Sequence, residues 1–183
     1  VAPSKSQFFV VKSNYKPTNK TILNSELAFS NNDANLFSSI DDNENKAFAG
    51  KVSWQQVLTD KKWQLKSKIS HEYTHKNFKT LQRWESIEFN RDWNILTNNA
   101  TKNYFQSEFS LENKHKDFII YRFNNLDYQD TFKGIKHEFL SKLNIQKTTF
   151  FADVSFLKNT SNLEDNYFLV AKTTAEHRFK NSW

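Results

Sequence analysis

The residues His71-Glu72-Tyr73-Thr74-His75 match the H-E-x-x-H pattern of a zinc site letter for letter. On a helix, two histidines four positions apart share a face and can hold one Zn²⁺ ion. The glutamate between them can then act as general base on a metal-bound water. This interpretation makes His71 and His75 zinc ligands and Glu72 the catalytic base, and it requires a helix across the motif.

A strand fits the same segment better than a helix does. Lysines precede the first histidine, and Lys76 follows the second, where the helix of a zinc metallopeptidase is normally apolar. In a strand, residues four apart lie about 13 Å from each other, too far to bind one ion. We therefore expect neither zinc nor enzymatic activity here, and a zinc metallopeptidase stays as an alternative.

The polar segment 31–46 is a second place where ligand chemistry could occur. From Asp41 onward, oxygen-bearing side chains recur at every second position, as in calcium-binding loops. Lys46 and Val52 stand where an EF-hand needs glycine and glutamate, which excludes that motif. A solvated turn without a cofactor is the expectation, and a looser Ca²⁺ site is the alternative, with three candidate ligands: Asp33, Asp41 and Asp42.

Aromatic residues make up 16% of the chain. Three interpretations of them remain open: interfacial girdles of a membrane barrel, ordinary core packing, and sugar-stacking platforms on an exposed sheet. The first and third would make tryptophans the binding residues. The candidates are Trp54, Trp63, Trp84 and Trp93.

Strict alternation of apolar and polar residues indicates the elements that carry these side chains. In 133–145, Ile135 and Phe139 fall on one face, and Lys136 and Glu138 fall on the other. A period of two is typical of a strand with one apolar and one wet face. The pattern recurs in 21–29, 150–156 and 167–175. It predicts an all-β fold, an antiparallel meander of about nine or ten strands that forms a closed barrel or a large twisted sheet.

The segment boundaries follow from the Asn- and Lys-rich stretches between the alternating runs. We expect strands at 8–15, 21–30, 47–57, 63–73, 80–90, 104–111, 118–123, 133–145, 150–156 and 167–175. We expect turns at 98–103, 112–116, 124–129 and 158–166. Because only two glycines are present, asparagine is expected at some positions that need a left-handed backbone.

Composition limits the remaining classes. A chain of 183 residues is long enough for one β domain, 1–183. Because it starts with Val1, it is expected to be a processed or excised part of a longer chain. The absence of cysteine excludes disulfides and thiolate metal sites. The net charge of +6 is dispersed among acidic residues instead of forming a stripe, so no nucleic-acid partner is expected.

Two stretches resemble pieces of large outer-membrane β-barrel proteins of the Bacteroidota. The segment 27–50, LAFSNNDANLFSSIDDNENKAFAG, resembles a strand–loop–strand unit of such barrels, and 88–95, EFNRDWNI, is similar to another piece. The resemblance implies a location in the cell outer membrane or the exported envelope. It also implies membrane lipid, and other envelope proteins, as partners.

We therefore expect a non-catalytic envelope protein, an outer-membrane β-barrel or barrel segment that serves transport or assembly. Phe, Leu, Ile and Val on alternate faces would then meet lipid or the sheet core. Lys, Glu and Asn on the opposite faces would line a wet lumen, and the 31–46 loop would project outside. A soluble β domain that binds a ligand or glycan through exposed aromatics is the first alternative, and the zinc metallopeptidase is the second.

Overall fold

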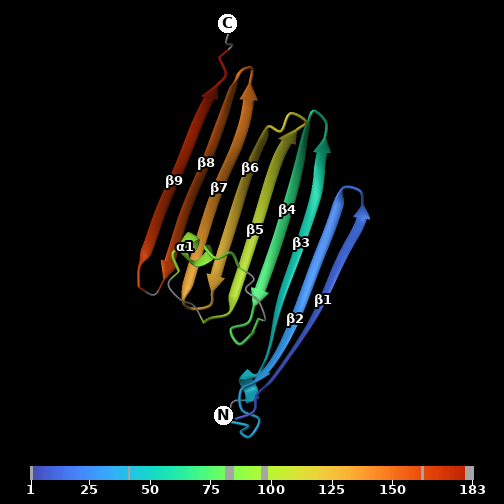
Figure 1. Cartoon of the computed structure of the whole chain (residues 1–183), viewed down its shortest axis with the longest axis vertical. Helices are drawn as coiled ribbons and strands as arrows, with labels where there is room; N and C mark the ends of the chain where they lie inside the picture. Colours follow the sequence, from blue (N-terminus) through green and yellow to red (C-terminus); the bar gives the residue numbers. More distant parts are fainter. Residues whose placement is uncertain (1, 41, 81–84, 96–98, 162, 180–183) are drawn as a thin grey trace.

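The chain forms one large antiparallel sheet with a short helical segment beside it (Figure 1). The structure is a computed structural model that describes residues 2–40, 42–80, 85–95, 99–161 and 163–179. Its elements are β1 (Lys5–Thr18), β2 (Thr21–Asp33), η1 (Asp42–Glu44), β3 (Lys46–Asp60), β4 (Trp63–Thr74), α1 (Phe89–Trp93), β5 (Lys102–Asn113), β6 (Phe118–Tyr128), β7 (Phe132–Ile145), β8 (Thr148–Ser161) and β9 (Asp165–His177).

The nine strands lie in chain order, and each pairs antiparallel with the next. In the part of the chain that the structure describes, no pairing joins β1 to β9, so the sheet is open with these two strands at its edges. The prediction of an all-β antiparallel meander is confirmed. The connections alternate between the two ends of the sheet, and Figure 1 shows the N-terminus near one end and the C-terminus near the other.

Each strand places alternate side chains on opposite faces of the sheet, as the sequence pattern predicted. We call one the covered face, because the segment 75–101 packs on it, and the other the open face. In β7, Lys136 and Glu138 lie on the covered face, and Ile135 and Phe139 lie on the open face. Direct cross-strand partners share a face, so the assignment extends through the register from β1 to β9.

The described parts of the segment 75–101 lie on the covered face and contribute to two hydrophobic clusters. Near its start, Phe78 packs on small residues of β2 and β3, with Phe8 and Val10 of β1 beside it. Near α1, Trp93 and Ile95 pack on β6, β7 and β8. The two groups of buried residues are Ala28, Ala47, Ala49 and Phe78 in one, and Trp93, Ile95, Leu126, Tyr128, Phe132 and Leu157 in the other.

Few glycines are needed because other residues adopt the left-handed backbone conformation. Positive φ angles occur at Asn94, Lys116, Asp130 and Gln146, each in a turn or at the end of α1. Asparagine tolerates this region better than most residues. Among the residues that the structure describes, the expected use of asparagine is therefore observed once, at Asn94, and three other residue types fill the remaining positions.

Three sequence predictions are wrong. The turn predicted at 158–166 is too long, because β8 runs to Ser161 and β9 begins at Asp165. The predicted strand at 80–90 is absent in its described part, because residues 85–90 form a bend, a turn and the beginning of α1. Phe89 there packs beside Trp93 on the sheet instead of pairing in it. The predicted turn at 124–129 is also wrong, because β6 continues to Tyr128. The strand persists since Asn124 finds hydrogen-bond partners on neighbouring strands and Leu126 is buried.

Candidate functional site: a charged face beneath the 75–101 segment

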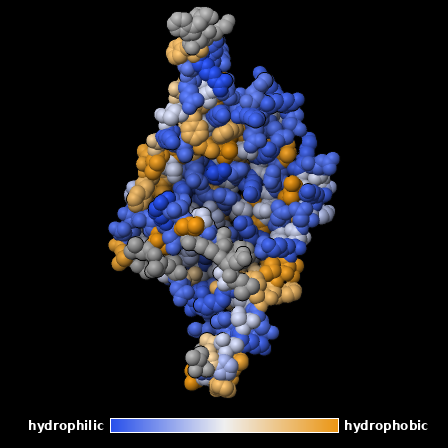
Figure 2. Space-filling view, in the orientation of Figure 1, coloured by the Kyte–Doolittle hydropathy of each residue, from blue (hydrophilic) through white to orange (hydrophobic). Residues whose placement is uncertain are grey.

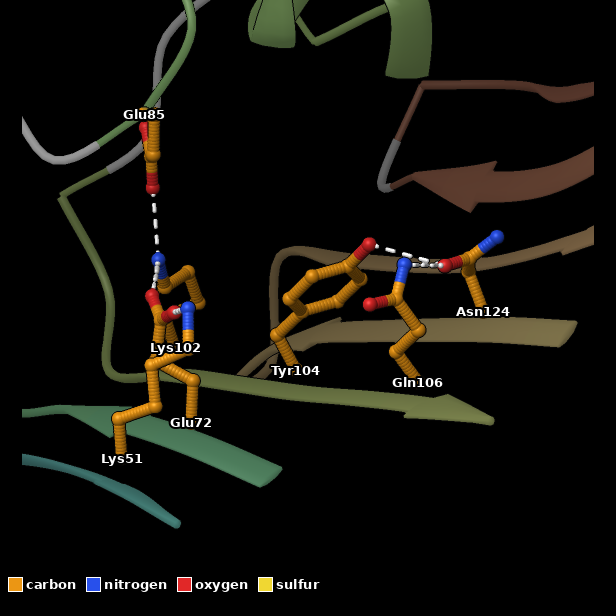
Figure 3. A network of polar contacts seen from close by, with 7 residues as sticks. All are labelled: Lys51, Glu72, Glu85, Lys102, Tyr104, Gln106 and Asn124. Atoms are coloured by element: carbon orange, nitrogen blue, oxygen red, sulfur yellow. Dashed lines mark hydrogen bonds and ion pairs between the residues drawn. The ribbon is translucent and has the colours of Figure 1, made fainter. Parts of the chain in front are cut away.

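Lys102, the first residue of β5, is the centre of an ion-pair network on the covered face. Its Nζ lies 2.5 Å from Oε1 of Glu72 in β4 and 2.7 Å from Oε1 of Glu85 in the 75–101 segment. Glu72 also pairs with Lys51 of β3 at 3.4 Å. Figure 3 shows the four side chains converging from three strands and the segment above them. Only 6% of the Lys102 side chain is exposed, whereas 54% of the Lys51 side chain is exposed, so the network runs from a buried lysine to a lysine in contact with water.

A second polar network lies farther along the same face and is centred on Asn124 of β6. Its Oδ1 accepts hydrogen bonds from the Tyr104 hydroxyl at 3.0 Å and from Gln106 Nε2 at 2.9 Å (Figure 3). Its Nδ2 donates to Glu138 of β7 at 3.0 Å, and Glu138 in turn pairs with Lys136 at 3.2 Å. The network thus connects β5, β6 and β7 through side chains alone.

Further ion pairs extend the polar lining over most of the covered face. Arg122 and Glu108 join β6 to β5 at 2.5 Å, and outlying pairs continue the pattern toward β1 and the far ends of β4 and β5. These pairs are Lys12–Glu26 and Lys66–Glu112. Figure 2 views the molecule with this face forward and shows mainly hydrophilic residues across its middle. Among the described residues, no buried side-chain nitrogen or oxygen lacks a hydrogen-bond partner.

This arrangement is suited to lining a wet surface. Each of the carboxylates in the two networks accepts a bond from a lysine or an amide, so none is left as an unpaired base beside a nucleophile. Mixed positive and negative groups in contact with water keep a surface hydrated without a strong field of one sign. The chemistry that the geometry supports is hydration and electrostatic screening.

The structure separates the residues of the H-E-x-x-H motif. Four of them end strand β4 and His75 follows it, so the motif does not lie on the helix that a zinc site requires. His71 is on the open face beside Val52 and Phe105, whereas Glu72 is on the covered face in the network described above. His75 follows the strand, where its Nδ1 accepts a hydrogen bond from the backbone of Asn77 at 3.2 Å.

The candidate calcium ligands are engaged locally. Asp33 Oδ1 accepts a bond from the backbone N–H of Asn35 at 2.9 Å, and Asp42 Oδ1 accepts from Asn45 Nδ2 at 3.0 Å. Asp41 lies outside the described residues. Nowhere in the described ranges do three or more histidine, cysteine, aspartate or glutamate side chains form a group that could hold a metal ion.

The tryptophans have different environments. Trp93 is buried against the sheet, which fits core packing. Trp54 lies on the open face of β3 with 48% of its surface exposed, and Trp63 begins β4 opposite Asn113. Trp84 lies outside the part that the structure describes. Core packing therefore accounts for Trp93, whereas the membrane and sugar interpretations stay predictions for Trp54 and Trp63.

The open face carries exposed large apolar side chains on every strand. Across it, from β1 to β9, many of these side chains are between 38% and 71% exposed. Cross-strand pairs of this kind include Phe9 with Phe29 and Phe109 with Tyr121. Representative members, one from each of seven strands, are Phe9, Leu27, Val52, Ile69, Phe109, Phe139 and Leu169.

Asp117 stabilises the connection 114–117 between β5 and β6. Its carboxylate accepts bonds from Asn113 Nδ2 at 2.7 Å, from the backbone N–H of Asn144 at 2.8 Å and from Asn144 Nδ2 at 2.6 Å. The hydrogen bonds from Asn113 and then from Asn144 hold the pKa of this carboxyl below its usual value. The connection is therefore tied to β7 as well as to its own hairpin.

Sequence reasoning missed the principal residues of the covered face. Lys102, Tyr104, Gln106 and Asn124 were not candidates, and Glu72 was one only for zinc chemistry. The alternation in β5 did carry a signal, because Gln106 and Glu108 oppose Phe105 and Phe109. That signal gives the face of each residue but not its partners.

None of the helices in the described residues is long and apolar enough to cross a membrane. Comparison of the chain with known proteins found no match among protein-family models, curated proteins or solved structures.

Proposed function

We propose that this chain is a non-catalytic envelope protein that forms the wall, or part of the wall, of a transmembrane β-barrel. In this proposal the open face contacts the acyl chains of the outer membrane, and the covered face lines an aqueous interior. The observation that carries the proposal is the segregation of the two faces. Large apolar side chains are exposed on the open face from β1 to β9, and ion pairs occupy the covered face from β1 to β7. The covered face departs from this pattern toward β9, where Phe168 and Val170 are exposed.

The extent of the open face supports a lipid environment. Soluble monomers rarely expose apolar patches larger than a few hundred Å². Here the exposed apolar residues run across all nine strands, from Phe9 in β1 to Leu169 in β9. Lipid contact would remove this surface from water, and charged residues on the opposite face would remain hydrated.

Strand lengths and connections support the same proposal. The strands have 11 to 15 residues, and about 9–11 residues cross a bilayer when the strand is tilted. Four connections at one end contain only two to four residues each. The other end carries the two long connections, 34–45 and 75–101, besides two connections of three residues. Membrane barrels likewise have short turns on one side and longer loops on the other.

The role that fits this arrangement is passage or assembly of other molecules. The described parts of the 75–101 segment pack on the covered face near the end with the long connections, where they contact β1–β3 and β6–β8. They would narrow an interior at that level and leave the ion-paired surface beyond them open to water. Lipid and other envelope proteins are the partners that such a wall would meet.

The test compares arginine substitutions at exposed apolar positions inside and outside the strands. Leu27 and Phe139 lie near the middle of β2 and β7 on the open face, and Phe37 is 83% exposed in the connection 34–45. In lipid vesicles, Leu27→Arg and Phe139→Arg should each lower the free energy of unfolding by about 2–4 kcal/mol. Phe37→Arg should change it by less than about 0.5 kcal/mol.

Unfolding would be followed by circular dichroism during urea titration of vesicle-bound protein. Equal small effects of all three substitutions would contradict lipid contact at the open face. A chain that stays folded and monomeric in buffer without detergent would favour a soluble domain that binds a ligand or glycan. The aromatic row Phe9–Phe29–Phe48, with Tyr73 stacked on Phe48 at 4.9 Å, would then be the surface to study.

A further inference from the structure

Each of the four connections at one end of the sheet carries lysine. The connections 19–20, 61–62, 114–117 and 146–147 all lie at the same end, because the meander alternates between its two ends. We call them together the short-connection rim. Its only acidic residue is Asp117, which is buried and bonded to Asn113 and Asn144. Its six lysines are all exposed: Lys20, Lys61, Lys62, Lys114, Lys116 and Lys147.

The opposite end of the sheet has the reverse balance of charged residues. In the described parts of the connections 34–45, 75–101, 129–131 and 162–164, acidic residues outnumber basic ones. The acidic residues are Asp42, Glu44, Glu85, Glu88, Asp92, Asp130 and Glu164, and the basic ones are Lys76, Lys79 and Arg91. The sheet therefore has a basic end and an acidic end, although its net charge is only +6.

Turn formation alone does not account for these lysines. Glycine, asparagine and aspartate are favoured in two-residue hairpin turns and at turn positions with positive φ. Lys116 nevertheless has a φ of 64°, and both residues of the connection 61–62 are lysines. Lysine contributes no side-chain hydrogen bond that would replace the asparagine or aspartate bond to the turn backbone.

We propose that the short-connection rim binds the anionic headgroups of phospholipids and thereby orients the sheet in the bilayer. This inference rests on the proposed function, because the rim meets headgroups only when the open face lies in lipid. Exposed lysine ammonium groups just outside the hydrocarbon layer attract phosphate-bearing headgroups. The acidic end of the sheet is repelled by these headgroups, so both ends of the molecule favour the same orientation.

The experiment uses the full chain and vesicles of phosphatidylcholine, with and without added phosphatidylglycerol. Binding is measured by flotation, and insertion is measured by protection of the strands from protease. The variant Lys61→Gln/Lys62→Gln removes two exposed charges from the rim. The variant Lys76→Gln/Lys79→Gln removes two exposed charges from the opposite end and serves as the matched control.

The wild-type chain should bind vesicles that contain phosphatidylglycerol more tightly than phosphatidylcholine vesicles. Lys61→Gln/Lys62→Gln should weaken that binding by roughly 25-fold, at about five-fold for each lysine, and leave binding to phosphatidylcholine unchanged. The control variant should bind both kinds of vesicle like the wild type. Protease should cut the long connections from one side of the vesicle only.

Three outcomes would each overturn either the inference or the proposed function. If the two double variants weakened binding to phosphatidylglycerol vesicles equally, the vesicles would be attracting the net charge of the protein, which would overturn the role of the rim. Insertion into phosphatidylcholine with no gain from phosphatidylglycerol would overturn the inference and leave the membrane wall standing. Binding to phosphatidylglycerol through Lys61 and Lys62 without insertion would overturn the proposed function while the affinity of the rim stood.

Discussion

Gly134 of β7 lies directly beneath the indole ring of Trp93: a Cβ built on Gly134 would be 2.9 Å from Cε3 and Cζ3 of Trp93. The Trp93 carbonyl also accepts a hydrogen bond from Asn159 Nδ2 of β8 at 2.8 Å. The absence of a side chain at position 134 therefore allows α1 to approach the sheet closely. This contact joins the 75–101 segment to the strands that lie far from its own ends.

We expect Gly134→Ala to lower the free energy of unfolding by about 1–3 kcal/mol, because the added methyl group overpacks a buried ring. Gly50→Ala is the control: its Cβ would meet the end of the Leu27 side chain at 3.1 Å, which can move. Urea unfolding followed by circular dichroism measures both. A loss at Gly50→Ala as large as that at Gly134→Ala would contradict the proposed close contact.

Lys102→Met should lower the free energy of unfolding by about 3 kcal/mol, because it leaves Glu72 and Glu85 without their shared cation. Lys133→Met is the control, since the Lys133 side chain is 73% exposed and lies 3.9 Å from Asp127. Exposed pairs contribute less than about 1 kcal/mol. The same urea titration tests this prediction, and similar losses in the two variants would argue against a buried network.

Trp54 and Trp93 should differ in their access to lipid. In vesicles made with brominated acyl chains, Trp54→Phe should reduce the fraction of tryptophan fluorescence that the bromine quenches. Trp93→Phe should leave the quenched signal unchanged, because Trp93 is 3% exposed and lies on the covered face. If removal of Trp93 reduced quenching as much as removal of Trp54, the assignment of the faces would be reversed.

Asp117 should contribute to a pH-dependent loss of stability in acid. Because its pKa is lower in the folded chain than in the unfolded one, its contribution is present above about pH 4 and disappears as the pH falls through the folded pKa. In Asp117→Asn this contribution is missing at every pH. The difference in urea midpoint between wild type and variant should therefore shrink as the pH falls from about 6 to 2. A constant difference over that range would contradict the prediction.

The alternation in the sequence was sufficient to predict most of the strands and which residues of a strand share a face. In β7, the pattern assigned Phe139 and Glu138 to opposite faces, and the structure agrees. Such predictions succeed because the period of two is local and repeats within one strand. The composition of each face followed without knowledge of which strands are neighbours.

The partners of the covered face could not be predicted in the same way. Lys102 pairs with Glu72 and Glu85, which lie 30 and 17 positions earlier in the chain, and no local period relates such residues. Asn124 appeared in an Asn-Asn pair that favours a turn locally. Hydrogen bonds from Tyr104 and Gln106 on the next strand outweigh that preference. Long-range contacts also replaced the predicted strand at 80–90 with a segment that packs on the sheet.

The number of strands also constrains how the sheet can be completed. Because successive strands alternate in direction, the first and ninth strands run the same way. Joining these two edges directly would create a single parallel seam in an otherwise antiparallel cylinder. An antiparallel cylinder therefore needs one, three or another odd number of additional strands between them. An added strand that pairs with β1 must present its hydrogen-bonding groups to Phe8–Val11, and one that pairs with β9 must present them to Tyr167–Val170.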